Sequence, residues 1–143
     1  MNKNEINVLD ELNKGACMGK DAIHFILEKV EDNALKEELN TQYKKYNEIS
    51  DKINNIYPKY NDDKPHETTA MNKVMTWYGI EMKTLTDDST SKIAELLLQG
   101  TNMGIIEGRR LLNHKNTNDE VHSLVQEYVD MQEDAVEKLK SFL

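Results

Sequence analysis

One feature of the sequence restricts its possible folds more than any other: apolar residues recur at alternating steps of three and four along most of the chain. This spacing places them on one face of a helix and is typical of helices that pack at shallow angles. Four long stretches carry such a stripe, and only 2 prolines interrupt the 143 residues, so the sequence predicts an all-α fold. The stripe of the first stretch, residues 4–31, consists of Leu9, Leu12, Ala16, Gly19, Ile23, Ile26 and Val30. The stripe of the second, which stops near Pro58, consists of Leu35, Leu39, Gln42, Tyr46, Ile49, Ile53 and Ile56.

The connections between these stretches predict how the helices follow one another. Asp32 and Asn33 supply capping side chains in a turn so short that the first two helices must be antiparallel neighbours. Residues 58–66 form a polar loop bracketed by prolines, and residues 67–85 predict a shorter helix. Thr117 and Glu120 predict a capping box that opens the last helix. We therefore expect a single four-helix-bundle domain over residues 1–143: one hairpin at about 4–57, a crossover with a short helix at about 58–88, and a second hairpin at about 89–143.

The two predicted hairpins are similar in sequence. Residues 14–27 align with residues 99–112 at an offset of 85, which pairs the motif Gly-x-x-Met-Gly of the first helix with the same motif in the third. Residues 35–53 align with residues 121–139 at an offset of 86. Two amphipathic hairpins can resemble each other through composition alone, but the repeated motif favours an internal duplication.

Glycines lie one turn apart on the two aligned helices: Gly15 and Gly19, then Gly100, Gly104 and Gly108. Each glycine inside a helix costs roughly 1 kcal/mol relative to alanine, so a compensating contact is expected. We predict that the helix that carries Gly19 and the helix that carries Gly104 cross closely near these two glycines. The alternative is a narrow cavity that the glycines clear for a ligand.

Charge and composition exclude several classes of partner. The net charge of −8 and the pI of about 5.0 disfavour nucleic acid and anionic membrane surfaces, which both repel an acidic protein. No apolar run approaches the ~20 residues that span a bilayer, and the N-terminus lacks the apolar segment of a secretion signal. The 1 cysteine cannot form an internal disulfide. The expected location is therefore cytoplasmic.

The arrangement of two hairpins joined by a crossover helix resembles the ferritin-like superfamily. The segments LNKGACMGKDAIHFILEKVEDNALKEEL, residues 12–39, and GTNMGIIEGRRLL, residues 100–112, are similar to small bacterial proteins of rubrerythrin type, many of unassigned function. This resemblance implies a ferritin-like four-helix bundle. In the metal-binding members, inward glutamates and Glu-x-x-His motifs hold a di-iron or di-manganese pair.

The sequence departs from this pattern where the metal ligands are expected. It has no Glu-x-x-His motif, and Lys20 stands where the first helix would present its glutamate. The second helix offers Gln42 and Tyr46, and the last offers Tyr128 and Gln132. A cationic lysine and neutral amides cannot neutralise two buried divalent ions. We therefore expect that the di-metal centre has been lost and that the protein has no cofactor.

Glu107 is the acid that falls on an inward stripe, and a buried carboxylate must be paired or protonated. We predict a Lys20–Glu107 ion pair within a polar core network that also contains Gln42, Tyr46, Tyr128 and Gln132. The alternative is that Glu107 lies at the edge of the bundle and points to water. If a metal is present after all, the candidate ligands are His24, Glu107 and Glu127.

These features predict a non-catalytic ferritin-like protein with a structural or protein-interaction role. The predicted helix at 67–85 carries Met71, Trp77 and Met82, and its apolar character favours a homodimer or another protein partner. The alternative is a metal-binding oxidase or metal-storage protein with atypical ligands. A third alternative is a small ligand in a glycine-lined cavity.

Overall fold

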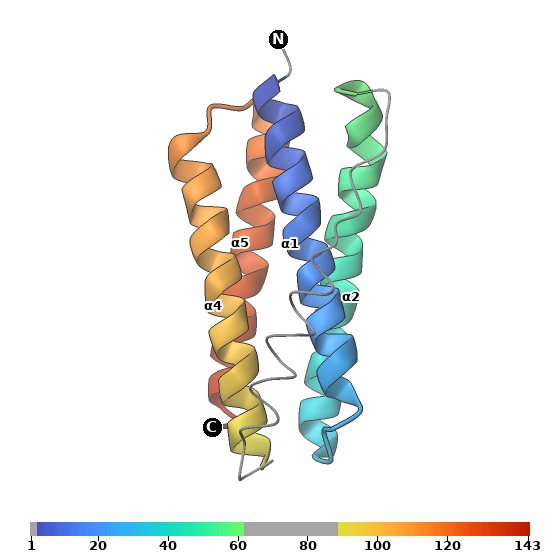
Figure 1. Ribbon diagram of the computed structural model, residues 1–143, viewed down its shortest axis with the longest axis vertical. Helices are drawn as coiled ribbons and strands as arrows, with labels where there is room; N and C mark the ends of the chain where they lie inside the picture. Colours follow the sequence, from blue (N-terminus) through green and yellow to red (C-terminus); the bar gives the residue numbers. More distant parts are fainter. Residues whose placement is uncertain (1–2, 62–88) are drawn as a thin grey trace.

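A computed structural model describes residues 3–61 and 89–143, and all regular structure in these two segments is helical. The elements are α1 (Lys3–Leu27), α2 (Asn33–Ile56), a short 3₁₀ helix η1 (Tyr57–Lys59), α4 (Thr90–His114) and α5 (Asp119–Lys140). The four α-helices lie side by side along the long axis of the molecule (Figure 1). The predicted all-α, four-helix arrangement is confirmed for the described residues.

Two hairpins, α1–α2 and α4–α5, make up the bundle, and packing within each hairpin is more extensive than packing between them. The turn between α1 and α2 matches the prediction, because the Asp32 side chain accepts a hydrogen bond from the amide of Leu35 at 2.8 Å. The first helix ends at Leu27, earlier than expected, since the amides of Lys29 and Val30 bond to carbonyls three residues back in a tight turn. Val30 is nevertheless buried, as its place on the stripe predicts.

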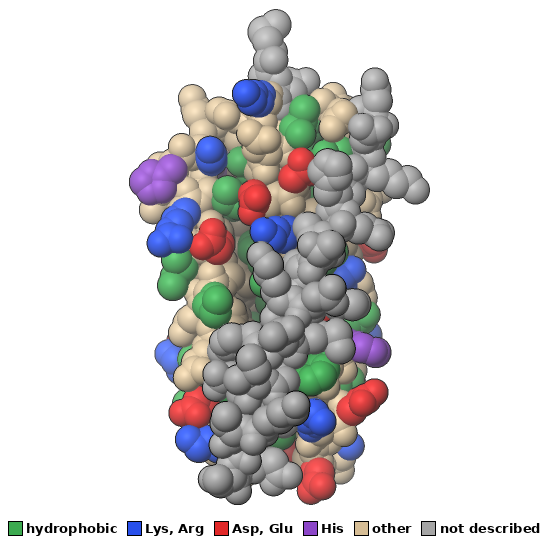
Figure 2. Space-filling view, in the orientation of Figure 1, with side chains coloured by type: hydrophobic (Ala, Val, Ile, Leu, Met, Phe, Trp, Pro, Cys, Tyr) green, Lys and Arg blue, Asp and Glu red, His purple; other side chains and the backbone are tan. Residues whose placement is uncertain are grey.

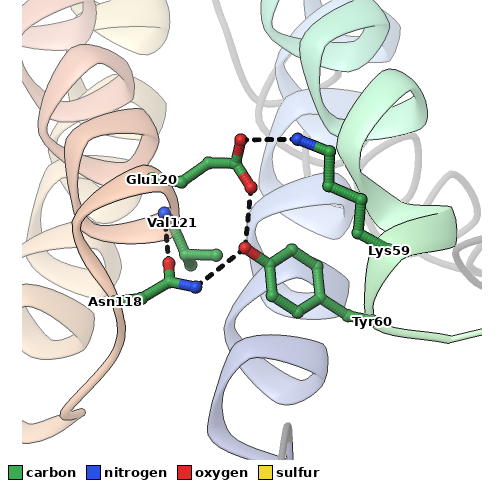
Figure 3. A network of polar contacts seen from close by, with 5 residues as sticks. All are labelled: Lys59, Tyr60, Asn118, Glu120 and Val121. Atoms are coloured by element: carbon green, nitrogen blue, oxygen red, sulfur yellow. Dashed lines mark hydrogen bonds and ion pairs between the residues drawn. The ribbon is translucent and has the colours of Figure 1, made fainter.

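The start of α5 differs from the predicted capping box. Asn118, and not Thr117, caps the helix: its side-chain oxygen accepts from the amide of Val121 at 3.0 Å. Glu120 does not turn back to the cap, because its carboxylate accepts hydrogen bonds from Lys59 at 2.9 Å and from Tyr60 at 2.7 Å (Figure 3). The hydroxyl of Tyr60 also accepts from the Asn118 side chain at 2.8 Å. The cap of one hairpin is thereby joined to the end of the other.

The core follows the predicted stripes closely on three of the four helices. Stripe residues of α1, α2 and α5 are almost all buried, including the polar Gln42 and Gln132. On α5 the predicted stripe consists of Val121, Val125, Tyr128, Gln132, Ala135, Leu139 and Phe142. On α4 the same spacing predicts a stripe of Ile93, Leu97, Gly100, Gly104, Glu107 and Leu111. This stripe holds only in the first half, where Ile93 and Leu97 are buried. The fully buried side chains of largest volume are Tyr57, Leu9, Leu12, Ile26, Leu35, Leu39, Ile49, Ile53, Ile93, Leu139, Val8 and Val121.

Three ion pairs join α2 and η1 to α5 along their shared seam. Lys45 pairs with Asp134 at 3.5 Å, Lys52 pairs with Glu127, and Lys59 pairs with Glu120 at 2.9 Å. The lysines follow one another at seven-residue steps and the acids do so in reverse order, as two antiparallel helices require. We call these three pairs the α2–α5 ladder.

The predicted helix at residues 67–85, with Met71, Trp77 and Met82, lies outside the described residues, as does most of the expected crossover at 58–88. The homodimer proposed on the apolar character of that helix therefore stays a prediction. Of the helices described, none is long and apolar enough to cross a membrane.

Candidate ligand-binding groove

A groove with a volume of about 680 Å³ separates α1 from α4 at mid-height of the bundle. On the face that carries these two helices, hydrophobic side chains over α4 lie among charged side chains of both signs (Figure 2). Met103 and Ile106 of α4, which are 56% and 51% exposed, line the groove. Its other lining residues are Glu11, Leu12, Lys14, Gly15, Met18, Gly19, Ala22, Ile23, Gln42, Tyr46, Leu97, Gly100, Thr101, Gly104, Glu107, Gly108, Arg110, Leu111, Tyr128 and Gln132.

The glycines of α1 receive aromatic rings from other helices. A Cβ atom built on Gly15 would lie 2.4 Å from the hydroxyl oxygen of Tyr128, a residue of α5. A Cβ atom on Gly19 would lie 2.5 Å from ring carbons of Tyr46, a residue of α2. Both distances are far below van der Waals contact, so only glycine admits these rings at their observed positions.

The glycines of α4 do the same for side chains of α5. A Cβ atom on Gly104 would lie 2.1 Å from the amide nitrogen of Gln132, and one on Gly108 would lie 2.5 Å from a methyl group of Val129. The prediction that the glycines mark a close α1–α4 crossing is therefore wrong. The groove lies between those two helices, and the glycines instead let side chains of α2 and α5 reach its base.

Two tyrosines and one glutamine meet at the base of the groove. The rings of Tyr46 and Tyr128 pack edge to face, with centroids 6.4 Å apart and an interplanar angle of 64°. The amide nitrogen of Gln132 donates a long hydrogen bond of 3.4 Å to the Tyr46 hydroxyl. The amide oxygen of Gln132 is buried and has no hydrogen-bond partner among the described residues. We call these three residues the Tyr–Gln cluster.

The Tyr–Gln cluster is uncharged. Burial raises the pKa of Tyr46, and a hydrogen bond from Gln132 only partly offsets this effect. Burial also holds the pKa of Tyr128 well above its ordinary value, and the neighbouring Tyr46 raises it further. Both phenols therefore stay protonated at neutral pH.

Gln42, the fourth predicted member of the polar network, is buried and lines the groove. Its amide nitrogen donates to the Glu38 carboxylate one turn earlier on α2, at 2.9 Å. This hydrogen bond runs along the helix that carries Gln42, whereas the hydrogen bond of Gln132 crosses from α5 to α2.

The predicted Lys20–Glu107 pair is wrong. The Glu107 side chain is 69% exposed and pairs with Arg110 one turn away at 3.0 Å. Lys20 is half-buried beside Asp21 on α1; burial raises the pKa of Asp21, while the charges of Lys20 and His24 lower it. Gly108, and not Glu107, is the buried residue of that turn of α4, so the stripe has shifted by one position. Glu107 therefore lies at the edge of the bundle, which was the alternative prediction.

The three candidate metal ligands lie on different helices, and their surroundings differ. His24 is exposed on α1, Glu107 pairs with Arg110, and Glu127 belongs to the α2–α5 ladder through Lys52. Within residues 3–61 and 89–143, no group of three or more His, Cys, Asp or Glu side chains could hold a metal ion. The phenols and amides of the Tyr–Gln cluster do not fit a di-metal centre, which takes carboxylates and imidazoles.

The sequence singled out Tyr46, Tyr128 and Gln132 individually but did not predict that glycines would receive them. The alignment of the two hairpins contained a signal for this cluster. At an offset of 86 residues, Tyr46 aligns with Gln132 and Gln42 aligns with Tyr128, so each aligned pair consists of one tyrosine and one glutamine. Comparison of the chain with protein-family models, with curated proteins and with solved structures found no match.

Proposed function

We propose that this chain is a non-catalytic helical protein that acts by binding, and that its binding site is the groove between α1 and α4. One observation carries the proposal: the base of the groove presents the neutral Tyr–Gln cluster. Uncharged phenols and an amide supply hydrogen bonds, but they lack the acid–base partner of a nucleophile and the anionic ligands of a cation.

The proposal includes a ferritin-like frame that arose by duplication. Support comes from two contacts that the sequence offset relates. Gly19 of α1 receives Tyr46 of α2, and at offsets of 85 and 86 residues Gly104 of α4 receives Gln132 of α5. Each hairpin thus carries the same glycine-to-side-chain contact at corresponding positions. A duplicated hairpin explains this correspondence, whereas similar composition alone does not.

Elemental analysis tests the proposal against the metal-dependent alternative. The full chain would be expressed in medium supplemented with iron, manganese and zinc and purified without chelators. We expect far less than one metal ion per chain, with no difference between the wild type and a His24→Ala, Glu127→Gln double variant. Stoichiometric metal that disappears in the double variant would establish the alternative, an oxidase or storage protein with atypical ligands.

A further inference from the structure

We propose that the groove between α1 and α4 takes an uncharged, largely apolar small molecule that donates one hydrogen bond to the amide oxygen of Gln132. This inference rests on the proposed binding function and names the class of ligand. Three properties of the groove support it: its size and lining, the unpaired amide oxygen at its base, and the neutrality of that base.

The size and lining of the groove match those of small-molecule sites. Its volume of about 680 Å³ lies within the ~300–1,000 Å³ that is usual for such sites. Leu12, Met18 and Ile23 line it from α1, and Leu97, Met103 and Leu111 line it from α4. Aliphatic and thioether side chains favour an apolar ligand, because binding removes apolar surface of both the ligand and the groove from contact with water.

Gln132 is the polar group that gives the site its specificity. It is only 2% exposed, yet its amide oxygen has no partner within the described residues. A Cβ atom on Gly104 would lie 2.1 Å from the amide nitrogen and 3.2 Å from the oxygen, so both atoms reach the α4 glycine that lines the groove. An unpaired buried carbonyl is costly, and a donor on the ligand removes that cost.

The neutral base of the groove disfavours an ionic ligand. At its base, the phenols of Tyr46 and Tyr128 are neutral and buried. The charged lining residues lie above this base: Glu107 and Arg110 pair with each other and are exposed, Glu11 is exposed, and Lys14 is half-buried. A charged ligand would lose its hydration at this base without gaining a counter-ion, which is strongly unfavourable.

Three matched fluorescent or displacing probes test the ligand class with the full chain. Phenyl-naphthylamine is apolar and uncharged and has one N–H donor. Phenylnaphthalene lacks the donor, and anilinonaphthalene sulfonate keeps the donor but adds an anionic group. We expect phenyl-naphthylamine to bind about fivefold to tenfold more tightly than phenylnaphthalene, the ratio of one net hydrogen bond, and the sulfonate to bind more weakly than either.

Two variants assign binding to the groove and to Gln132. Gln132→Met keeps the volume of the side chain and removes both amide groups, so it should abolish the preference for phenyl-naphthylamine over phenylnaphthalene. Gly100→Leu places a side chain in the groove and should weaken both neutral probes. Gln99→Leu is the matched control, because Gln99 is the exposed neighbour of Gly100 and does not line the groove. Thermal melts establish that each variant is folded.

Each outcome decides the proposal. The donor preference, its loss in Gln132→Met and weaker binding in Gly100→Leu but not in Gln99→Leu would support it. Failure of both neutral probes to bind, equal binding of the two, or tighter binding of the sulfonate would overturn it. Elemental analysis uses no probe, so a failure of this inference is distinguishable from a failure of the proposed non-catalytic function.

Discussion

At the scale of single residues, glycines in this bundle leave space into which side chains of other helices pack. Tyr46 and Tyr128 insert their rings against Gly19 and Gly15, and Gln132 inserts its amide against Gly104. The penalty that each glycine imposes on helix formation is offset by burial of a large side chain at that position. An added methyl group would therefore act as an obstacle in the core.

Gly19→Ala should destabilise the protein by about 1–3 kcal/mol, the usual cost of overpacking a core. The cost arises because the ring of Tyr46 is buried and rigid, so it cannot move away from a Cβ atom 2.5 Å from its carbons. Urea unfolding followed by circular dichroism measures the change in the free energy of unfolding.

Gly100→Ala is the matched control for this prediction. Gly100 lies in α4 at the position aligned with Gly15; it lines the groove and has an ordinary helical backbone conformation. We expect Gly100→Ala to stabilise the protein by about 0.4–1 kcal/mol through its effect on the unfolded chain. Stabilisation by Gly19→Ala as well would show that Tyr46 does not occupy the position described.

The buried tyrosines predict a loss of stability at alkaline pH. Their folded-state pKa values are raised by burial, whereas in the unfolded chain both phenols ionise at their ordinary pKa. The unfolded state therefore loses protons that the folded state keeps, and its free energy falls relative to the folded state. The contribution of the neutral phenols is complete below about pH 10 and is lost as the pH rises through the raised folded values.

Thermal melts between neutral pH and pH 11 test this linkage in the wild type and in a Tyr46→Phe, Tyr128→Phe variant. The wild type should lose stability more steeply above about pH 10, since phenylalanine cannot ionise. Lysine titration affects both proteins alike and cancels in the comparison. Parallel curves for the two proteins would contradict the prediction.

Sequence pattern could identify the buried residues on α1, α2 and α5 because their stripes keep one register from end to end. It could not place Glu107, since the α4 stripe shifts by one position after Leu97 and buries Gly108 instead. The reason is local: α4 has a groove on one side, and glycines give no hydrophobic signal that marks the buried face. For the same reason, the sequence pattern could not predict the contacts between glycines and the Tyr–Gln cluster.

At the scale of elements, the ends of the helices are fixed by a few side chains that also join the two hairpins. Asn118 caps α5 and donates to Tyr60, which in turn donates to Glu120 (Figure 3). The same end of the bundle is held by Glu5 of α1, which accepts from the Asn118 amide at 3.2 Å. One asparagine thus makes hydrogen bonds to both hairpins.

Asn118→Ala should lower the free energy of unfolding by about 1–2 kcal/mol, the upper range for loss of an N-cap. The cap bond to Val121 and the bond to Tyr60 are lost together, which places the effect at the upper end. Chemical unfolding measures it. Thr117→Ala is the control and should change stability by less than about 0.5 kcal/mol, as is usual for a surface residue without such a role.

The alternative assignment, a capping box with Thr117 as the cap, predicts the opposite order of the two variants. Sequence could establish that a cap occurs here but not which residue provides it, since Thr117 and Asn118 are both good caps. The choice depends on Glu120, whose carboxylate is taken by Lys59 and Tyr60 of the other hairpin. Such a distant partner cannot be inferred from local spacing.

At the scale of the whole molecule, the two seams between the hairpins differ in character. The α2–α5 ladder joins the hairpins on one side through exposed ion pairs. On the other side, α1 and α4 enclose the groove. Helical periodicity could predict four packed helices, but it treats both seams alike and so could not predict that, among the described residues, one of them carries a groove.

Reversal of one rung of the α2–α5 ladder tests how much the ladder contributes. Lys52→Glu should lower the free energy of unfolding by about 0.2–1 kcal/mol, because it faces Glu127 across an exposed contact. The double variant Lys52→Glu, Glu127→Lys should recover most of this loss, and added salt should shrink every difference. A double-mutant cycle in low and high salt measures the coupling, and its absence in both would contradict the pairing.

The even spacing of the α2–α5 ladder has a consequence for alignment. If the first hairpin slid along the second by two helical turns, about 10.5 Å, Lys52 would meet Asp134 and Lys59 would meet Glu127, so charge alone permits more than one alignment. Shape favours the observed alignment, because the slide would move Tyr128 away from Gly15, whose missing side chain admits its ring. In this bundle, the smallest residue selects which of several electrostatically acceptable alignments is the native one.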